Sequence, residues 1–220
     1  MDQDLKKNIL STGTSLVGIV CKDGVVMGSD RRVSAGGMLV VGKNFQKTSQ
    51  INDYLVISVA GTVSDAQLNS KVIAAQLKLK ELKDKQRPTV KEAASYIAMM
   101  KFQNIRRPSM IPAIVANLVG GINEDGTSEL YNIGPDGSIT LVDDYDASGS
   151  GTILMLGLLE RQYKKNLSTK EGIELVIESI KSSSARDTAS GNGVDVFTIT
   201  KEGIKHVSKQ TVENVYKEQN

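Results

Sequence analysis

The chain has 220 residues, and its 27 Lys and Arg residues against 25 Asp and Glu residues leave a formal net charge of +2. This near balance, with aromatic residues at 4% and no Trp, argues against a surface built to bind nucleic acid. One His and one Cys also argue against a conventional His-ligated zinc site and against a Ser-His or Cys-His catalytic pair.

No segment has the pattern of a secretory signal or a membrane span. Residues 1–13 carry four charged side chains, which the apolar core of a signal peptide would exclude. The apolar run from Met110 to Ile122 is too short for a span and is interrupted by Asn117 and glycines.

Cys21 lies in an apolar run, which is typical of a small buried side chain. We therefore expect a cytoplasmic protein that neither crosses nor binds a membrane.

The N-terminal region contains a candidate nucleophile. Gly13-Thr14 stands between a polar leader, residues 1–12, and an apolar run, residues 15–21. A threonine hydroxyl needs a base, and a free α-amine on the same residue, with a pKa of about 7.7 to 8, would serve near neutral pH. Cleavage after Gly13 would create nucleophile and base together.

The first half of the chain changes from strand patterns to helix patterns. A turn at residues 22–24 predicts a hairpin between its two flanking strands. Apolar residues at helical spacing predict a helix from Val63 to about Asp84, and the capping box Thr89 to Glu92 opens a second helix ending near Ile105. The strands predicted in this half are 14–21, 24–30, 38–41 and 55–61.

The second half repeats this order. Strands are predicted near 113–120, 129–133 and 138–142, then a helix over 151–165 and another opened by the capping box Ser168 to Glu171. Strands near 194–200 and 204–207 and a short helix from about Thr211 complete the chain. Two helix pairs between strand groups predict an α+β domain whose sheets are covered by helices on their outer faces.

Several separated motifs together resemble the β-type subunit of the archaeal proteasome, an N-terminal-nucleophile hydrolase. They occur in the family's order from Thr14 to the last strands. The matching segments are Gly13-Thr14, Val17-Gly18-Ile19, Gly28 to Val33, Lys47 with Gln50-Ile51, Ser58 to Gly61 with Asp65-Ala66-Gln67, Gly120-Gly121, Ser148 to Gly151 and Arg186 to Gly193.

This resemblance implies a four-layer αββα sandwich, with two antiparallel sheets face to face and helices outside. It implies that residues 1–13 are a propeptide and that residues 14–220 form a single catalytic domain. The expected partners are proteasome α-type subunits in heptameric rings, other β subunits, and unfolded polypeptide substrates, with an unfoldase ATPase acting indirectly. No metal or organic cofactor is implied.

The resemblance also implies roles for single residues. Thr14 would be the nucleophile, with Asp30 and Lys47 as its acidic and lysine partners. The backbone N–H of Gly61 would stabilise the oxyanion. Ser150, Asp187 and Ser190 match the supporting polar residues. The segment 34–46 is about one residue longer than the family pattern, so Lys43 competes with Lys47, which we prefer because Gln50-Ile51 follow it at the family's spacing.

The chemistry of these residues is consistent with those roles. A lysine ammonium near Thr14 would favour deprotonation of both the amine and the hydroxyl. Two unit charges about 4 Å apart interact by roughly 4 kcal/mol at an effective dielectric constant near 20, which moves a pKa by a few units. Asp30 would hold Lys47 charged and oriented.

The resemblance places Val33, Val59 and Val63 around the pocket for the residue that precedes the cut. Three valines favour apolar side chains, so we expect cleavage after hydrophobic residues. Ser15 departs from the family, which often has a threonine here. Strand alternation would place Ser15 on the opposite face from Thr14, so we expect it to have little effect.

The leading hypothesis is a threonine endopeptidase that cleaves itself between Gly13 and Thr14. An alternative is a structural β-type ring subunit without activity, although the presence of Thr14, Asp30 and Lys47 argues against it. A third is a non-proteolytic N-terminal-nucleophile amidase or the simpler bacterial proteasome-like peptidase, which lacks the 186–193 pattern in this form. An α-type subunit would need a longer N-terminal segment.

Overall fold

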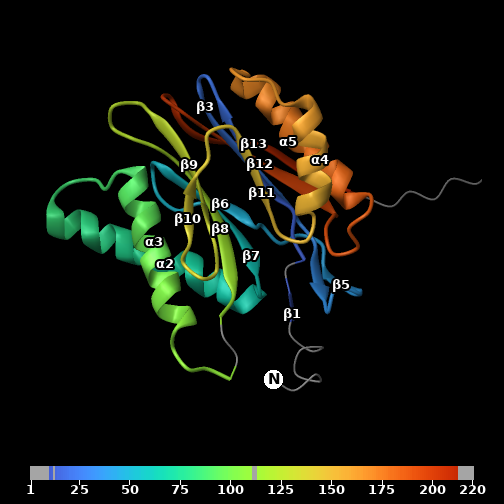
Figure 1. The fold of residues 1–220 in the computed structure, drawn as a ribbon, viewed down its shortest axis with the longest axis horizontal. Helices are drawn as coiled ribbons and strands as arrows, with labels where there is room; N and C mark the ends of the chain where they lie inside the picture. The colour runs from blue at the N-terminus through green and yellow to red at the C-terminus, as the bar shows by residue number, and fades with distance from the viewer. Residues whose placement is uncertain (1–9, 12, 111–112, 213–220) are drawn as a thin grey trace, which may run out of the picture.

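The computed structural model describes residues 10–11, 13–110 and 113–212. Two five-stranded antiparallel sheets form its centre, and Figure 1 shows helices outside them. In spatial order, the first sheet contains β10 (Ile139–Leu141), β9 (Ser128–Ile133), β8 (Val115–Ile122), β7 (Leu55–Gly61) and β6 (Thr48–Gln50). The second contains β11 (Tyr145–Ser148), β2 (Leu16–Cys21), β3 (Gly24–Asp30), β12 (Gly193–Thr200) and β13 (Gly203–Thr211).

A third, smaller sheet lies beside the start of the domain. It contains β1 (Leu10–Ser11), β4 (Val33–Ala35) and β5 (Leu39–Gly42), in that order. Strand β1 pairs antiparallel with β4, so that Leu10 is opposite Ala35. Residues 10–11, upstream of Thr14, therefore run along the edge of β4.

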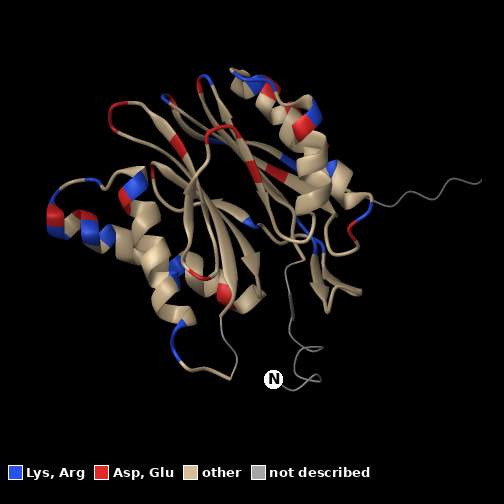
Figure 2. Ribbon diagram, in the orientation of Figure 1, with Lys and Arg blue, Asp and Glu red and all other residues tan. Residues whose placement is uncertain are grey.

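Helices α2 (Val63–Asp84) and α3 (Val90–Ile105) follow the predicted bounds, because local capping sets where they begin. The Thr62 side chain caps α2, and Thr89 and Glu92 form the predicted capping box of α3. Figure 2 shows acidic and basic residues mixed on α2. They include the exposed ion pairs Lys78–Glu81 and Lys80–Asp84, and pairs of this kind contribute little to stability.

Helices α4 (Thr152–Gln162) and α5 (Thr169–Ser184) cover the second sheet. Ser168 and Glu171 form the capping box predicted for α5. The helix packs closely on β3, because a Cβ on Gly28 would lie 2.4 Å from Cγ1 of Val176. A larger residue at position 28 would push α5 away from the sheet.

Two hydrophobic clusters hold the layers together. One joins the facing sides of the two sheets through residues such as Met27, Leu118 and Ile199 and continues beneath α2 and α3 through Ile73 and Ile97. The other lies between the second sheet and helices α4 and α5. The predicted αββα sandwich is thereby confirmed, and its driving force is apolar burial on both sides of each sheet.

The structure corrects several predicted boundaries. Helix α4 ends at Gln162 rather than near residue 165, and β13 extends to Thr211 rather than ending at Val207. The predicted terminal helix cannot begin at Thr211, which pairs with Gly193, and its remaining residues, 213–220, lie outside the described residues. The short strands β4, β6 and β11 were not predicted.

None of the helices in residues 10–11, 13–110 and 113–212 is long and apolar enough to cross a lipid bilayer. Among the same residues, no group of three or more His, Cys, Asp or Glu side chains is placed to hold a metal ion.

Candidate active site

Thr14 is fully buried two residues before β2 begins, and the turn at residues 149–151 holds its backbone. Its nitrogen donates to Oγ of Ser150 at 3.0 Å, and its carbonyl oxygen accepts from the Gly151 N–H at 3.2 Å. Gly149 adopts a positive φ of 97°, and a Cβ there would lie 2.1 Å from the Thr14 carbonyl oxygen. The glycines of the Ser148 to Gly151 motif therefore let this turn close around Thr14.

Asp30 and Lys47 form a buried ion pair next to this turn. Nζ of Lys47 lies 2.7 Å from Oδ1 of Asp30, and both side chains have no exposed surface. The carboxylate also accepts backbone N–H groups from Ser15 at 2.9 Å, Arg32 at 3.0 Å and Gly191 at 2.9 Å. One ammonium and three peptide N–H groups thus fix the position of the Asp30 carboxyl group.

The structure separates the two competing lysines. Lys43 is exposed, whereas the backbone carbonyl of Lys47 accepts from the Val59 N–H at 2.9 Å, which places Lys47 beside β7. Burial lowers the pKa of Lys47, and the charge and hydrogen bond of Asp30 oppose that shift. Lys47, not Lys43, is therefore the lysine next to Thr14.

The peptide bond between Gly13 and Thr14 faces this lysine. Nζ of Lys47 donates to the Gly13 carbonyl oxygen at 2.5 Å. Space at Gly13 is limited, because a Cβ there would lie 2.0 Å from Cβ of Ala189 and 2.8 Å from the Ala189 carbonyl oxygen. An ammonium thus polarises the carbonyl before Thr14, and only a glycine fits at position 13 without a shift.

Asp187 connects the two predicted serines. Its Oδ2 accepts from Oγ of Ser150 and from Oγ of Ser190, both at 2.6 Å, and its Oδ1 accepts from the Ala189 N–H at 3.0 Å. Burial raises the pKa of Asp187, but the hydrogen bonds from Ser150, Ser190 and Ala189 and the charge of Lys47 outweigh this effect and lower it below its usual value. The carboxylate is therefore ionised and anchored one hydroxyl away from the Thr14 nitrogen.

Gly61 is the last residue of β7 and pairs with Val115 of β8. A Cβ at Gly61 would lie 2.5 Å from the carbonyl oxygen of Ile114, so the close approach of β8 requires a glycine here. Because Lys47 is bonded to Val59, two residues earlier on β7, Gly61 lies at the Lys47 end of the strand.

The three predicted pocket valines come from different elements. Val33 is a buried residue of β4, Val59 is a buried residue of β7 in the core between the sheets, and Val63 is half-buried at the start of α2. Val59 therefore contributes to the core whatever its role in a pocket.

Residues that received no role also contact the site. Arg32 Nε donates to Oδ1 of Asn192 at 2.7 Å, and its Nη1 donates to the Thr188 carbonyl at 2.8 Å, so it ties the loop around Asp187 to the residues that follow β3. The sequence signal that could have identified Arg32 as a site residue is its position two residues after Asp30. Ser15 was expected to face away from Thr14 and to have little effect, yet its Oγ lies 2.8 Å from Oγ of Ser190, one of the predicted site residues.

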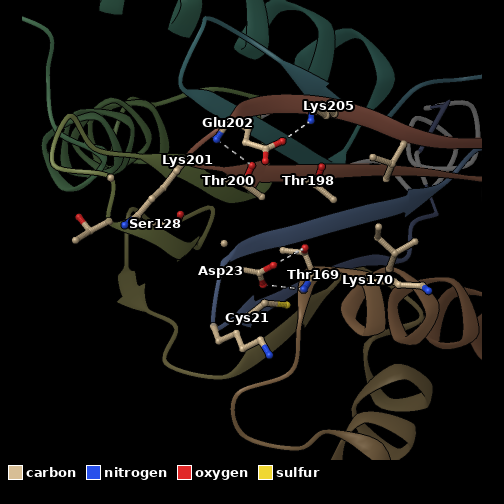
Figure 3. A pocket seen from close by; sticks show the side chains of 16 residues that line it. Cys21, Asp23, Ser128, Thr169, Lys170, Thr198, Thr200, Lys201, Glu202 and Lys205 are labelled. Atoms are coloured by element: carbon tan, nitrogen blue, oxygen red, sulfur yellow. Dashed lines mark hydrogen bonds and ion pairs between the residues drawn. The ribbon is translucent and has the colours of Figure 1, made fainter.

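A large open cavity of about 830 Å³ lies at the other end of β2 and β3. Figure 3 shows Asp23 bonded to Thr169 and Glu202 bonded to Lys205 on its walls. Burial, followed by the charges of Asp23 and Glu171, raises the pKa of the lining thiol Cys21 to about 12. This thiol stays protonated near neutral pH, and none of the site residues described above lines the cavity.

Known proteins are similar to this chain in sequence over most of its length. The family model described as proteasome subunit matches residues 10–199. A proteasome subunit beta of Methanobrevibacter smithii is 41% identical over 92% of this chain and 95% of its own length. Those of Methanopyrus kandleri and Archaeoglobus profundus are each 36% identical, covering 94% and 92% of this chain and 96% and 92% of their own lengths. The chain, with Thr14 beside a buried lysine at the start of its αββα sandwich, therefore belongs to the proteasome subunit family.

Proposed function

We propose that this chain is a threonine endopeptidase, the catalytic β subunit of a barrel-shaped proteasome core particle that degrades unfolded proteins. The observation that carries this proposal is the position of the Lys47 ammonium. It lies 2.5 Å from the Gly13 carbonyl oxygen and 2.7 Å from Asp30, next to the buried Thr14. A structural subunit without activity has no need for a buried cation at this peptide bond, because burying a charge is costly.

The first reaction would be self-cleavage between Gly13 and Thr14. The Thr14 hydroxyl attacks the Gly13 carbonyl carbon, and Lys47 stabilises the negative charge that develops on the carbonyl oxygen. The C–N bond then breaks, the Thr14 nitrogen takes up the hydroxyl proton, and an ester joins Gly13 to the Thr14 oxygen. Water hydrolyses this ester, which releases residues 1–13 as a carboxylic acid and leaves residues 14–220 as the catalytic domain.

Substrate hydrolysis would use the amine that this step creates. Ser150 accepts an N–H from Thr14, so the lone pair of the free amine can take the proton of the Thr14 hydroxyl. The acyl-enzyme then forms, the amine protonates the leaving group, and water completes hydrolysis. The Gly61 N–H would hold the oxyanion in this reaction.

Substrate and partners follow from the same assignment. Strand β4, which pairs with β1 in the uncleaved chain, would pair with a substrate strand once residues 1–13 have left. Val33, Val59 and Val63 would favour an apolar residue before the cut. The partners would be α-type subunits and other copies of this chain in rings, within the cytoplasm.

Intact mass spectrometry of the assembled particle tests the proposal directly. We expect each copy to have lost residues 1–13 and to begin at Thr14, because the carbonyl of Gly13 is held against Lys47. N-terminal sequencing should then read Thr14-Ser15-Leu16. An assembled particle that retains residues 1–13 and still hydrolyses peptides would contradict the mechanism.

Replacing Gly13 with Ala should slow self-cleavage by about 100-fold or more, since misplacing a reacting group by about 1 Å has an effect of this size. The new Cβ would overlap Ala189, so the Gly13 carbonyl must move. A time course of intact mass measures the rate. Gly157→Ala is the matched control, because a Cβ on Gly157 meets nothing within 4 Å, and we expect it to process normally. Equal rates for the two variants would contradict this account.

A further inference from the structure

We propose that Ser15 and Ser183 are positioning residues for the nucleophile: they form a buried chain of hydroxyls that holds Ser190, and through it Asp187, in place beside Thr14. This inference rests on the proposed function. It adds two side chains that do not touch the reacting atoms and that come from distant parts of the sequence.

The contacts of the chain are continuous. Oγ of Ser183, in the last turn of α5, lies 2.6 Å from Oγ of Ser15, which lies 2.8 Å from Oγ of Ser190. Ser190 donates to Asp187 at 2.6 Å, and the same Oδ2 accepts from Ser150 at 2.6 Å. Ser15, Ser183 and Ser190 have no exposed surface, so this end of the chain is shielded from bulk water.

The direction of the hydrogen bonds follows from counting protons. An ionised carboxylate only accepts, so Ser150 and Ser190 each commit their single hydroxyl proton to Asp187. Ser190 must then accept from Ser15, and Ser15, with its own proton committed, must accept from Ser183. The bonds therefore run one way, from α5 to Asp187, and each polarises the next.

The arrangement of Asp187 matters because of what Ser150 does with its proton. While the Ser150 hydroxyl donates its hydrogen bond to Asp187, the Ser150 oxygen is free to accept an N–H from Thr14, as the 3.0 Å contact shows. If Asp187 turned away, Ser150 could instead donate to the lone pair of the freed amine. That bond would occupy the base that must receive the hydroxyl proton of Thr14.

A glycine makes room for this chain. A Cβ on Gly151 would lie 2.1 Å from Oγ of Ser15 and 2.8 Å from Cβ of Ser183. Any side chain at position 151 would therefore displace the hydroxyls. The requirement for glycine in the Ser148 to Gly151 motif thus has a second cause besides the turn around Thr14.

Ser179 provides a comparison within the same helix. It is as completely buried as Ser183, but it donates to the Leu175 carbonyl at 2.7 Å, which is a common local bond for a helical serine. Ser183 also donates toward a local carbonyl, that of Ile180 at 2.9 Å, so its proton is shared between this carbonyl and the closer Oγ of Ser15. Ser183 differs in its short contact with Ser15, a residue 168 positions away in the sequence.

The test compares kcat and KM of four processed particles on a fluorogenic peptide: Ser15→Ala, Ser183→Ala, the double variant, and Ser179→Ala as the matched control. We expect Ser15→Ala to lower kcat about 5-fold and Ser183→Ala about 3-fold, in keeping with single hydrogen bonds. The double variant should match Ser15→Ala alone, because Ser183 acts only through Ser15. KM should not change, and Ser179→Ala should keep the parent kcat.

The outcomes separate this inference from the proposed function. A parent particle that hydrolyses nothing would refute the proposed function itself. If the parent is active, two results would overturn the hydroxyl chain. One is an equal kcat for Ser183→Ala and Ser179→Ala. The other is that the effects of Ser15→Ala and Ser183→Ala multiply in the double variant. If the Ser15→Ala particle does not assemble, the comparison of Ser183→Ala with Ser179→Ala decides alone, with thermal unfolding showing whether both lose similar stability.

Discussion

Replacing Thr14 with Ala is expected to lower peptide hydrolysis by the assembled particle by at least about 10⁴-fold, the scale seen when a catalytic nucleophile is removed. The variant keeps the backbone bonds of Thr14 to Ser150 and Gly151, so its fold should be retained. Because the same hydroxyl would attack Gly13, the variant should also retain residues 1–13. Fluorogenic peptide assays and intact mass measure the two effects.

Thr14→Ser is the control for this experiment, because it restores a hydroxyl at the same place. It should process itself and hydrolyse peptides at a measurable rate. If instead Thr14→Ala leaves the activity of the particle unchanged, another subunit supplies the nucleophile. This chain would then be the structural ring subunit considered as the alternative.

Replacing Lys47 with Met should have the second largest effect. Met fills a similar volume without charge, so the Gly13 carbonyl loses the ammonium that polarises it and Asp30 loses the ammonium that donates to it. We expect both self-cleavage and peptide hydrolysis to fall by at least about 10³-fold, comparable with removing a strong electrostatic stabiliser. Leaving a buried charge unpaired should also cost about 3 to 5 kcal/mol of unfolding free energy.

A double variant distinguishes lost chemistry from lost stability. Asp30→Asn combined with Lys47→Met removes both charges, so much of the stability lost in the single variant should return. The recovery should be incomplete, because the new amide nitrogen cannot accept the backbone N–H that the carboxylate oxygen accepted. Activity should remain absent. Denaturant unfolding and peptide assays on both variants give the comparison. Hydrolysis restored together with stability would show that Lys47 acts only on the fold.

The helices were the part of the fold that local signals predicted best. The bounds of α2 and α3 match the prediction, and the capping boxes at Thr89 and Ser168 are present. A capping box involves residues three positions apart, so its physics is visible in the sequence. By contrast, β4, β6 and β11 contain three or four residues each, and their pairing partners, rather than a pattern of their own, make them strands.

In the site, too, the sequence indicated the types of residue, whereas the tertiary structure set where they lie. The sequence could indicate Thr14, Asp30 and Asp187 as candidates, and it could propose Lys47 while leaving Lys43 open. The choice between the lysines depends on the pairing of Lys47 with Val59, a tertiary contact that also buries the ammonium against Asp30. Arg32 and Ser15 were not assigned roles, because their partners Asn192 and Ser190 are 160 and 175 positions away.

By itself, the sequence determined the order of strands and helices, the family resemblance, and the candidate nucleophile at the end of a short polar leader. These depend on neighbouring residues, on periodicity and on ordered motifs. Only the tertiary structure decided which lysine faces Gly13, why position 13 has no room for a side chain, and which hydroxyls hold Asp187. Those features arise where residues 13–15 meet Lys47 and residues 183–190, which are distant in the sequence. The distances between them are set by how the two sheets and α5 pack together.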